Sequence, residues 1–151
     1  MIKIICLGKI KESYIQSGIE EYKKRISKYT NIEVYELQDE GISDKKIALK
    51  KEKERILKII NKKDYIITLE IEGKELSSLE LSKKIEDIFM INSNITFIIG
   101  GSYGLDDEIK QLSYFKLYFS KMTFPHQLFR LVLLEQIYRS FKIMNNEEYH
   151  K

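Results

Sequence analysis

Residues Phe119–Lys142 read FSKMTFPHQLFRLVLLEQIYRSFK, and this stretch decides the fold of the chain. It holds the only proline, Pro125, and one of the two histidines, His126, directly before a strongly apolar helical pattern. Proline fixes its own φ and suits the first turn of a helix. We therefore expect a rigid loop up to Pro125, with a binding site in it, and a packing helix from there to about Met144.

The helix after Pro125 is more apolar than one buried face requires, since ten of the sixteen residues from Leu128 to Ile143 are apolar. Either the helix is fully buried inside a monomer, or it packs partly on the sheet and partly on a second subunit. Glu135 and Arg139 lie four residues apart within it, which is the spacing of an ordinary helical ion pair. At a subunit interface the same pair is partly desolvated and can act on a substrate.

Upstream, strand and helix patterns alternate along the whole chain. Short β-branched runs predict five strands, and apolar residues recurring at threes and fours predict five helices. The expected strands are Ile2–Leu7, Ile32–Leu37 near an edge, a central Tyr65–Leu69, Ile95–Ile99 and Tyr114–Ser120. The expected helices are Ser13–Tyr29, Asp44–Ile60, Ser77–Asn92, Leu105–Leu112 and Pro125–Met144. This order predicts a single α/β domain, residues 1–151, with a mostly parallel five-stranded sheet and helices on both faces.

Composition and charge limit the classes of protein to which this chain can belong. The chain has 151 residues, 43% of them hydrophobic and 32% charged, as in a globular domain. Its single cysteine, Cys6, lies among apolar residues and favours a reducing, cytoplasmic setting, and no stretch predicts a signal peptide or a membrane span. Residues 1–68 carry 16 Lys and Arg against 11 Asp and Glu, residues 69–108 carry 3 against 9, and residues 109–151 carry 7 against 3. Nucleic-acid contact and lysine-rich solvated helices both explain this pattern.

Three segments that follow predicted strands are chemically unusual: Leu69–Gly73, Gly100–Gly104 and Phe119–Phe124. In parallel α/β sheets, ligands bind outside the carboxyl ends of the strands, so we expect a site where these segments meet. The glycines of Gly100–Gly104 fit a loop that wraps a small molecule, and equally a tight turn between strand and helix. Neither a dinucleotide fingerprint nor a phosphate-binding loop is present in the sequence.

The histidines give weaker signals. His126 stands at a helix start, where we expect it to orient the loop through a hydrogen bond rather than to act as an acid or base. His150 lies in the terminal segment 147–151, which is an ordinary place for a frayed end. The sequence has no clustered His and Cys pattern, so no metal site is expected.

Three segments together resemble one family: FIIGGSYGL (Phe97–Leu105), FSKMTFPHQLFRLVLLEQIYRSFKI (Phe119–Ile143) and the terminal YHK (Tyr149–Lys151). They are similar to the RlmH family of small ribosomal-RNA pseudouridine N3-methyltransferases, which belong to the SPOUT or α/β-knot class. The similarity extends over the whole chain, including the opening KIICLGKIKESYI and the later ITLEIEGK. The departures, Ser102-Tyr103 in the glycine loop and Ser140, lie at positions that we regard as variable.

The resemblance implies a C-terminal trefoil knot that holds S-adenosyl-L-methionine. It also implies a cytoplasmic homodimer that methylates N3 of a pseudouridine in a stem-loop of large-subunit ribosomal RNA. Because the catalytic domain uses the whole length, we expect the assembled ribosome to be the substrate. By motif match, the cofactor contacts fall at Leu69, Gly100, Phe119, Ser120, Lys121, Met122, Thr123 and Phe124.

The expected catalytic residues are Glu135, Arg139, Tyr149 and His150. Methylation of a ring nitrogen requires that its proton leave and that the resulting charge be stabilised. We expect Glu135 to be a proton acceptor or an orienting group, and Arg139 a base or a phosphate anchor. Tyr149 and His150 form a tail that closes over the nucleotide. The alternatives are a non-catalytic α/β module that binds RNA or a nucleotide, and a flavodoxin-like enzyme.

Overall fold

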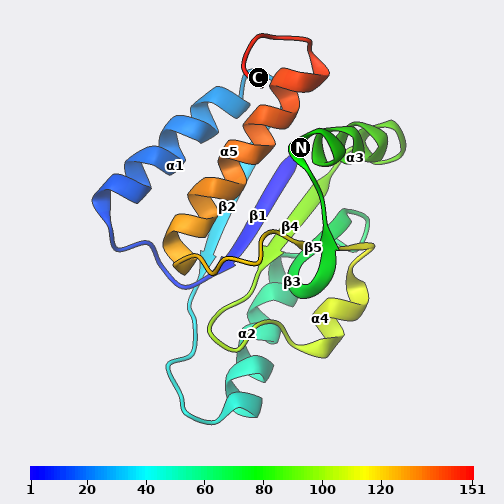
Figure 1. The fold of residues 1–151 in the computed structure, drawn as a ribbon. Coiled ribbons are helices and arrows are strands. Elements are labelled where there is room, and N and C mark those ends of the chain that lie inside the picture. Colours follow the sequence, from blue (N-terminus) through cyan, green and yellow to red (C-terminus); the bar gives the residue numbers. More distant parts are fainter.

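The computed structural model describes residues 1–151, and its strands form one parallel sheet in the order β2-β1-β4-β3-β5 (Figure 1). The strands are β1 (Ile2–Leu7), β2 (Ile32–Leu37), β3 (Tyr65–Glu75), β4 (Ile95–Ile99) and β5 (Phe115–Tyr118). The helices are α1 (Ser13–Ile26), α2 (Lys45–Ile59), α3 (Ser78–Ile91), α4 (Asp107–Leu112) and α5 (His126–Met144). The predicted α/β class is confirmed, and every strand pair is parallel.

The burial of each strand follows from its place in the sheet. β1 and β4 are neighbours in the middle, and every residue of both is buried, as their continuous apolar runs predict. β2 lies at one edge and alternates between half-buried and exposed residues. β3 lies inside the sheet, between β4 and β5. The predicted edge position of the second strand and the interior position of the third are therefore confirmed.

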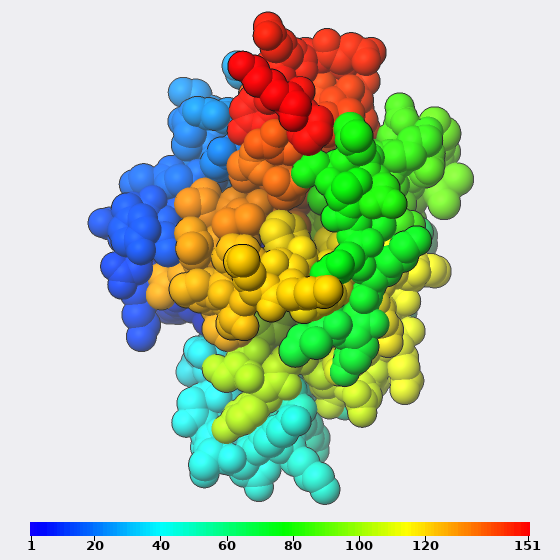
Figure 2. Space-filling view, viewed as in Figure 1, coloured from blue at the N-terminus to red at the C-terminus, as the bar shows by residue number.

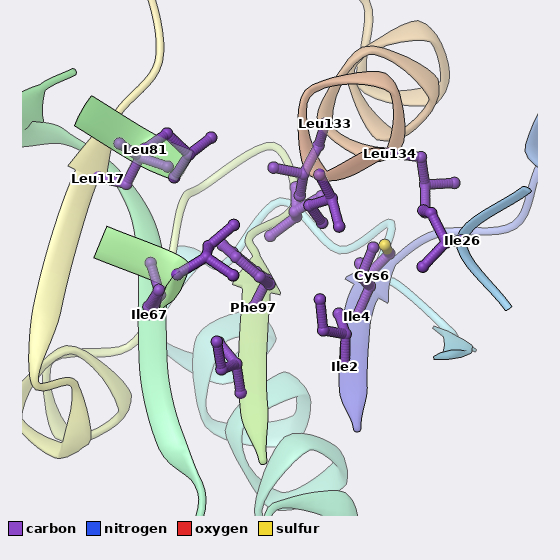
Figure 3. Packing of buried hydrophobic residues seen from close by; sticks show 14 of the residues in the cluster. Ile2, Ile4, Cys6, Ile26, Ile67, Leu81, Phe97, Leu117, Leu133 and Leu134 are labelled. Atoms are coloured by element: carbon purple, nitrogen blue, oxygen red, sulfur yellow. The ribbon is translucent and has the colours of Figure 1, made fainter. Parts of the chain in front are cut away.

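Helices cover both faces of the sheet. α1, α3 and α5 pack on one face, where α5 lies between the other two helices (Figure 1). Leu133 and Leu134 of α5 point toward the strand residues Ile4 and Phe97 in this core (Figure 3). α2 and α4 pack on the opposite face over a smaller buried cluster. No helix combines the length and the hydrophobicity that crossing a membrane requires.

The ends of two strands differ from the prediction. β3 continues past Leu69 because its pairing with β5 shifts there and resumes with Lys74 opposite Leu117. The β5 backbone approaches so closely that a Cβ on Gly73 would lie 2.7 Å from the carbonyl oxygen of Lys116. A glycine and a register shift are typical of a bulge, which the sequence alone presents as a loop. β5 is shorter than predicted because the chain leaves the sheet after Tyr118.

Candidate active site

A pocket of about 450 Å³ lies at the carboxyl ends of β3, β4 and β5. Three chain segments form it: residues 69–71, where the extension of β3 begins, the glycine loop from Gly100, and the loop 119–124 after β5. Figure 2 shows the loop after β5 in gold, next to the β3 extension in green and above the glycine loop in yellow-green. All eight residues predicted to contact the cofactor line this one pocket.

The glycine loop is a tight turn that also forms the pocket wall. The Gly104 amide donates to the Gly101 carbonyl at 3.0 Å, and Gly104 has a φ of 77°, which favours glycine. A Cβ on Gly100 would lie 2.5 Å from the Gly104 carbonyl oxygen, so the two strands of the turn touch. The sequence left a ligand loop and a tight turn as alternatives; the structure shows the tight turn, and this turn lines the pocket.

Three phenylalanines form an apolar wall of the pocket. Phe119 and Phe129 meet edge to face with ring centroids 5.0 Å apart, and the Phe124 ring lies 6.3 Å from Phe119. Ser102, Ser120 and Thr123 contribute hydroxyl groups to the lining. A pocket of this kind suits a flat aromatic group that is attached to a polar, hydroxylated part.

Several lining residues were not predicted. Gly101 and Gly104 belong to a loop that the sequence did indicate, and Phe129 lies one helical turn after Pro125, which was the available signal for it. Glu70 and Ile71 likewise lie in the predicted segment Leu69–Gly73, although they were not among the expected cofactor contacts. The lining residues outside the three predicted segments are Ile99, Leu117, Tyr118, His126 and Phe129.

The loop is not oriented by His126 as expected. The His126 side chain is exposed, lines the pocket and makes no hydrogen bond within the chain. Its neighbour Gln127 instead accepts hydrogen bonds from the backbone amides of Lys11 at 2.6 Å and Glu12 at 3.2 Å. Gln127 thereby caps the start of α1, whose own N-cap residue provides no side-chain cap, and ties the start of α5 to it.

The four predicted catalytic residues form one cluster near the C-terminal end of α5. Glu135 Oε1 accepts from Arg139 Nε at 3.0 Å, from Arg139 Nη2 at 2.5 Å and from the Tyr149 hydroxyl at 3.1 Å. Arg139 Nη1 lies 3.3 Å from His150 Nδ1, and its guanidinium stacks over the Tyr149 ring at 4.7 Å. The terminal segment therefore folds back onto α5 instead of fraying.

The surroundings of this cluster set its protonation states. The hydrogen bond to Glu135 raises the pKa of Arg139, so the guanidinium stays charged. Burial raises the pKa of the Tyr149 phenol, and hydrogen bonds with Tyr22 and Glu135 raise it further. Arg139 is therefore a cation at physiological pH. Tyr149 is a neutral donor at physiological pH.

The catalytic cluster and the pocket are separate within one chain. None of the four cluster residues lines the pocket, whereas His126 at the start of α5 does. Glu135 comes nine residues after His126, which corresponds to about 14 Å along a helix. The structure thus brings the predicted catalytic residues together and the predicted cofactor residues together, at two places on α5.

Comparisons with known proteins identify the family of this chain. The family described as "Predicted SPOUT methyltransferase" matches residues 1–150. The chain belongs to this SPOUT methyltransferase family. It is similar to the ribosomal RNA large subunit methyltransferase H of Clostridium botulinum, with 51% identity, and to that of Clostridioides difficile, with 50% identity. In both comparisons 99% of each chain is covered.

Two solved structures with much lower sequence identity share the fold of this chain. A probable methylase family protein from Haemophilus influenzae superposes with a TM-score of 0.60 at 14% identity, over 99% of this chain and 70% of that chain. The TrmH/SpoU tRNA modifying enzyme of A. aeolicus superposes with a TM-score of 0.53 at 12% identity, over 95% and 77%. At these identities the likeness concerns the fold alone.

Proposed function

We propose that this protein transfers the methyl group of S-adenosyl-L-methionine to N3 of a pseudouridine in a stem-loop of large-subunit ribosomal RNA. The observation that carries the proposal is the convergence of all eight motif residues on one pocket of a SPOUT methyltransferase chain. The activity in the names of its relatives supports the same substrate class. The proposal takes residues 1–151 as one catalytic domain and the assembled ribosome as the substrate.

The pocket fits S-adenosyl-L-methionine in size and chemistry. Its volume of about 450 Å³ lies within the range typical of small-molecule sites. The phenylalanine wall suits an adenine ring, and the strand ends and hydroxyl groups suit a ribose. When bound, the cofactor supplies an electrophilic methyl group on a sulfonium. Leu69, Gly100 and the residues Phe119, Ser120, Lys121, Met122, Thr123 and Phe124 would hold it.

Glu135 orients the catalytic groups and is not the proton acceptor. One of its carboxylate oxygens already accepts from Arg139 twice and from Tyr149, and the other accepts from Gln136 at 2.8 Å. These donors occupy the lone pairs that face them, so the carboxylate serves to hold its neighbours rather than to collect a further proton. Its role is to hold the Arg139 fork and the Tyr149 phenol in one geometry.

Arg139 anchors the RNA and stabilises negative charge. Loss of the N3 proton to solvent water leaves negative charge on the ring, and a permanently charged guanidinium beside it lowers the energy of that state. Arg139 donates to His150 Nδ1, which leaves the other imidazole nitrogen carrying the proton. His150 can then donate a hydrogen bond to a carbonyl oxygen of the base.

A homodimer would join the two sites. Since Arg139 comes ten residues after Phe129, the last pocket residue on α5, and so lies about 15 Å further along the helix, a second copy would bring an Arg139 to the methyl group. The half-buried apolar side chains of α5 support such a contact: Leu128, Phe129, Leu131, Val132, Tyr138 and Ile143. Light scattering at micromolar concentration should give the mass of a dimer, and a monomer would contradict this part of the proposal.

The knot and the location of the protein belong to the same proposal. After the edge strand β5 the chain forms the pocket loop 119–124 and then continues as α5, which packs over the middle of the sheet. That path supports a C-terminal trefoil knot in which α5 threads a preceding loop. The lone cysteine, Cys6, is buried and unpaired, which supports a reducing cytoplasmic location.

The direct test is methyl transfer from labelled S-adenosyl-L-methionine to intact ribosomes, compared with free ribosomal RNA. We expect label in the large-subunit RNA of intact ribosomes and little in free RNA. No incorporation into either substrate by a folded protein would overturn the proposal. A non-catalytic RNA-binding module predicts salt-sensitive RNA binding without any thermal stabilisation by S-adenosyl-L-methionine.

Replacing Gly100 by alanine should abolish cofactor binding, because the new Cβ would lie 2.5 Å from the Gly104 carbonyl oxygen and distort the turn. At a hundredfold excess over Kd, the cofactor adds about 2.7 kcal/mol to the stability of the wild type. Differential scanning fluorimetry should show this as a rise in Tm of roughly 5–10 °C, and none in the variant. Gly41→Ala, whose Cβ would meet nothing within 4 Å, should keep the rise. An equal rise in Gly100→Ala would contradict the assigned pocket.

A further inference from the structure

The terminal segment 145–151 is held in place although it is largely exposed. The chain turns back after α5 at Asn146, which has a φ of 53°. The segment then carries Tyr149 and His150 onto the catalytic cluster. A chain end normally frays, so the contacts that hold this one determine where two predicted catalytic residues lie.

One side chain makes the contacts that fasten the segment at its start. The Glu147 carboxylate accepts a hydrogen bond from the Tyr29 hydroxyl at 2.8 Å and forms an ion pair with Lys142. Tyr29 follows α1 and Lys142 lies on α5, so Glu147 joins both helices to the tail. The Glu147 amide also donates to the Lys142 carbonyl at 2.9 Å.

The two partners of Glu147 are themselves fixed. The Tyr29 ring stacks on Phe141 of α5 with ring centroids 5.4 Å apart and nearly parallel planes. Lys142 follows Phe141 directly on the helix, and its ammonium lies 6.0 Å from the centre of the Tyr138 ring. The side chain of Glu148, in contrast, is exposed and makes no hydrogen bond or ion pair. Of the two neighbouring glutamates, only Glu147 therefore ties the tail to both helices, while Tyr149 and His150 contact the cluster residues Glu135 and Arg139.

We propose that Glu147 is a positioning residue for methyl transfer: it latches the tail to α1 and α5 and so holds Tyr149 and His150 against Glu135 and Arg139 before RNA binds. The expected effect of Glu147 on activity rests on the proposed function. Whether Glu147 keeps the tail ordered in the free protein does not depend on that function. Glu147 itself touches neither the cofactor pocket nor the four clustered residues.

The pKa of Glu147 agrees with a latch that is closed at neutral pH. The hydrogen bond from Lys142 lowers this pKa, and the one from Tyr29 lowers it further. A carboxylate whose pKa is lower in the folded than in the unfolded protein stabilises the fold fully at pH values above its unfolded-state pKa. This stabilisation is lost only as the pH falls through the lowered pKa of the folded state. The Glu147 carboxylate therefore stays charged, and keeps its contacts with Lys142 and Tyr29, over the pH range in which ribosomes work.

The first test uses the free protein. Hydrogen exchange of residues 147–151, and release of the terminal residues by carboxypeptidase, should be slow in the wild type and at least tenfold faster in Glu147→Ala, because the fastened end then frays. Glu147→Gln should lie between them, since it can still accept from Tyr29 but lacks the charge for Lys142. Glu148→Ala, at the neighbouring exposed position, should match the wild type.

The second test measures kinetics with intact ribosomes. Glu147→Ala should lower kcat by about 10- to 100-fold, as expected when a catalytic group is misplaced, with the KM for S-adenosyl-L-methionine unchanged. Glu148→Ala should keep the wild-type kcat. Equal tail exchange and equal kcat in Glu147→Ala and Glu148→Ala would overturn the latch. If the wild type transfers no methyl group, the proposed function fails, and the exchange experiment still decides whether Glu147 fastens the tail.

Discussion

Replacement of Arg139 by alanine should lower the rate of methyl transfer to ribosomes by about 10²- to 10³-fold, the usual cost of removing a charge-stabilising donor. The variant loses the only cation that contacts Glu135, Tyr149 and His150 together. Because Arg139 does not line the cofactor pocket, thermal stabilisation by S-adenosyl-L-methionine should be unchanged. Arg139→Lys keeps the charge but loses the bidentate fork, so it should recover only part of the rate.

Mixing two inactive variants tests how the sites combine. If pocket and cluster come from different subunits, Gly100→Ala mixed with Arg139→Ala forms heterodimers that each contain one complete site. Random exchange of subunits should then restore about a quarter of the wild-type activity. A mixture as inactive as its components, with exchange shown by mass spectrometry of the dimers, would contradict the shared site. A wild-type rate for Arg139→Ala alone would remove Arg139 from the mechanism.

Replacement of Lys3 by methionine should destabilise the protein by about 3–5 kcal/mol, which is the usual cost of leaving one member of a buried ion pair alone. The Lys3 ammonium lies 3.3 Å from Asp64 Oδ2, and their side chains are 10% and 1% exposed. The Thr96 hydroxyl donates to the same oxygen at 2.9 Å, but Asp64 Oδ1 has no partner. Thermal unfolding should show a fall in Tm of roughly 6–20 °C.

The double variant Lys3→Met/Asp64→Asn is the control for this prediction. It leaves no buried charge, and the asparagine can still accept from Thr96, so most of the lost stability should return. A double variant that is as unstable as the sum of the two single variants would mean that cavity formation, and not an unpaired charge, causes the loss.

The hydrophobic pattern predicted most of the secondary structure. β1, β2 and β4 have the predicted boundaries, because continuous or alternating apolar runs report directly which sides of a strand are buried. The predicted helix start at Ser77 is also confirmed, since Ser77 is the N-cap of α3 and forms a capping box with Glu80. The bulged end of β3 was missed because it depends on the close approach of β5, which no local pattern encodes.

The candidate site was predictable in its parts. The glycine loop and the segment 119–124 carry signals of their own, and motif resemblance located Glu135, Arg139, Tyr149 and His150. That the first set lines one pocket and the second forms a separate cluster further along α5 became visible only in three dimensions. The proposed orienting role of Glu135 likewise rests on hydrogen bonds to both of its carboxylate oxygens, which the sequence does not show.

Within Phe119–Lys142, the sequence pattern was sufficient to predict a loop ending at a proline and a strongly apolar helix, because periodicity and proline geometry act over a few residues. Only the tertiary structure decided the strand order and the capping of α1 by Gln127, 115 residues away. It alone decided the latch between Tyr29 and Glu147, 118 residues apart. An apolar or polar pattern states that a side chain needs a partner, but not which distant residue will provide it. That choice is made when all the elements pack together.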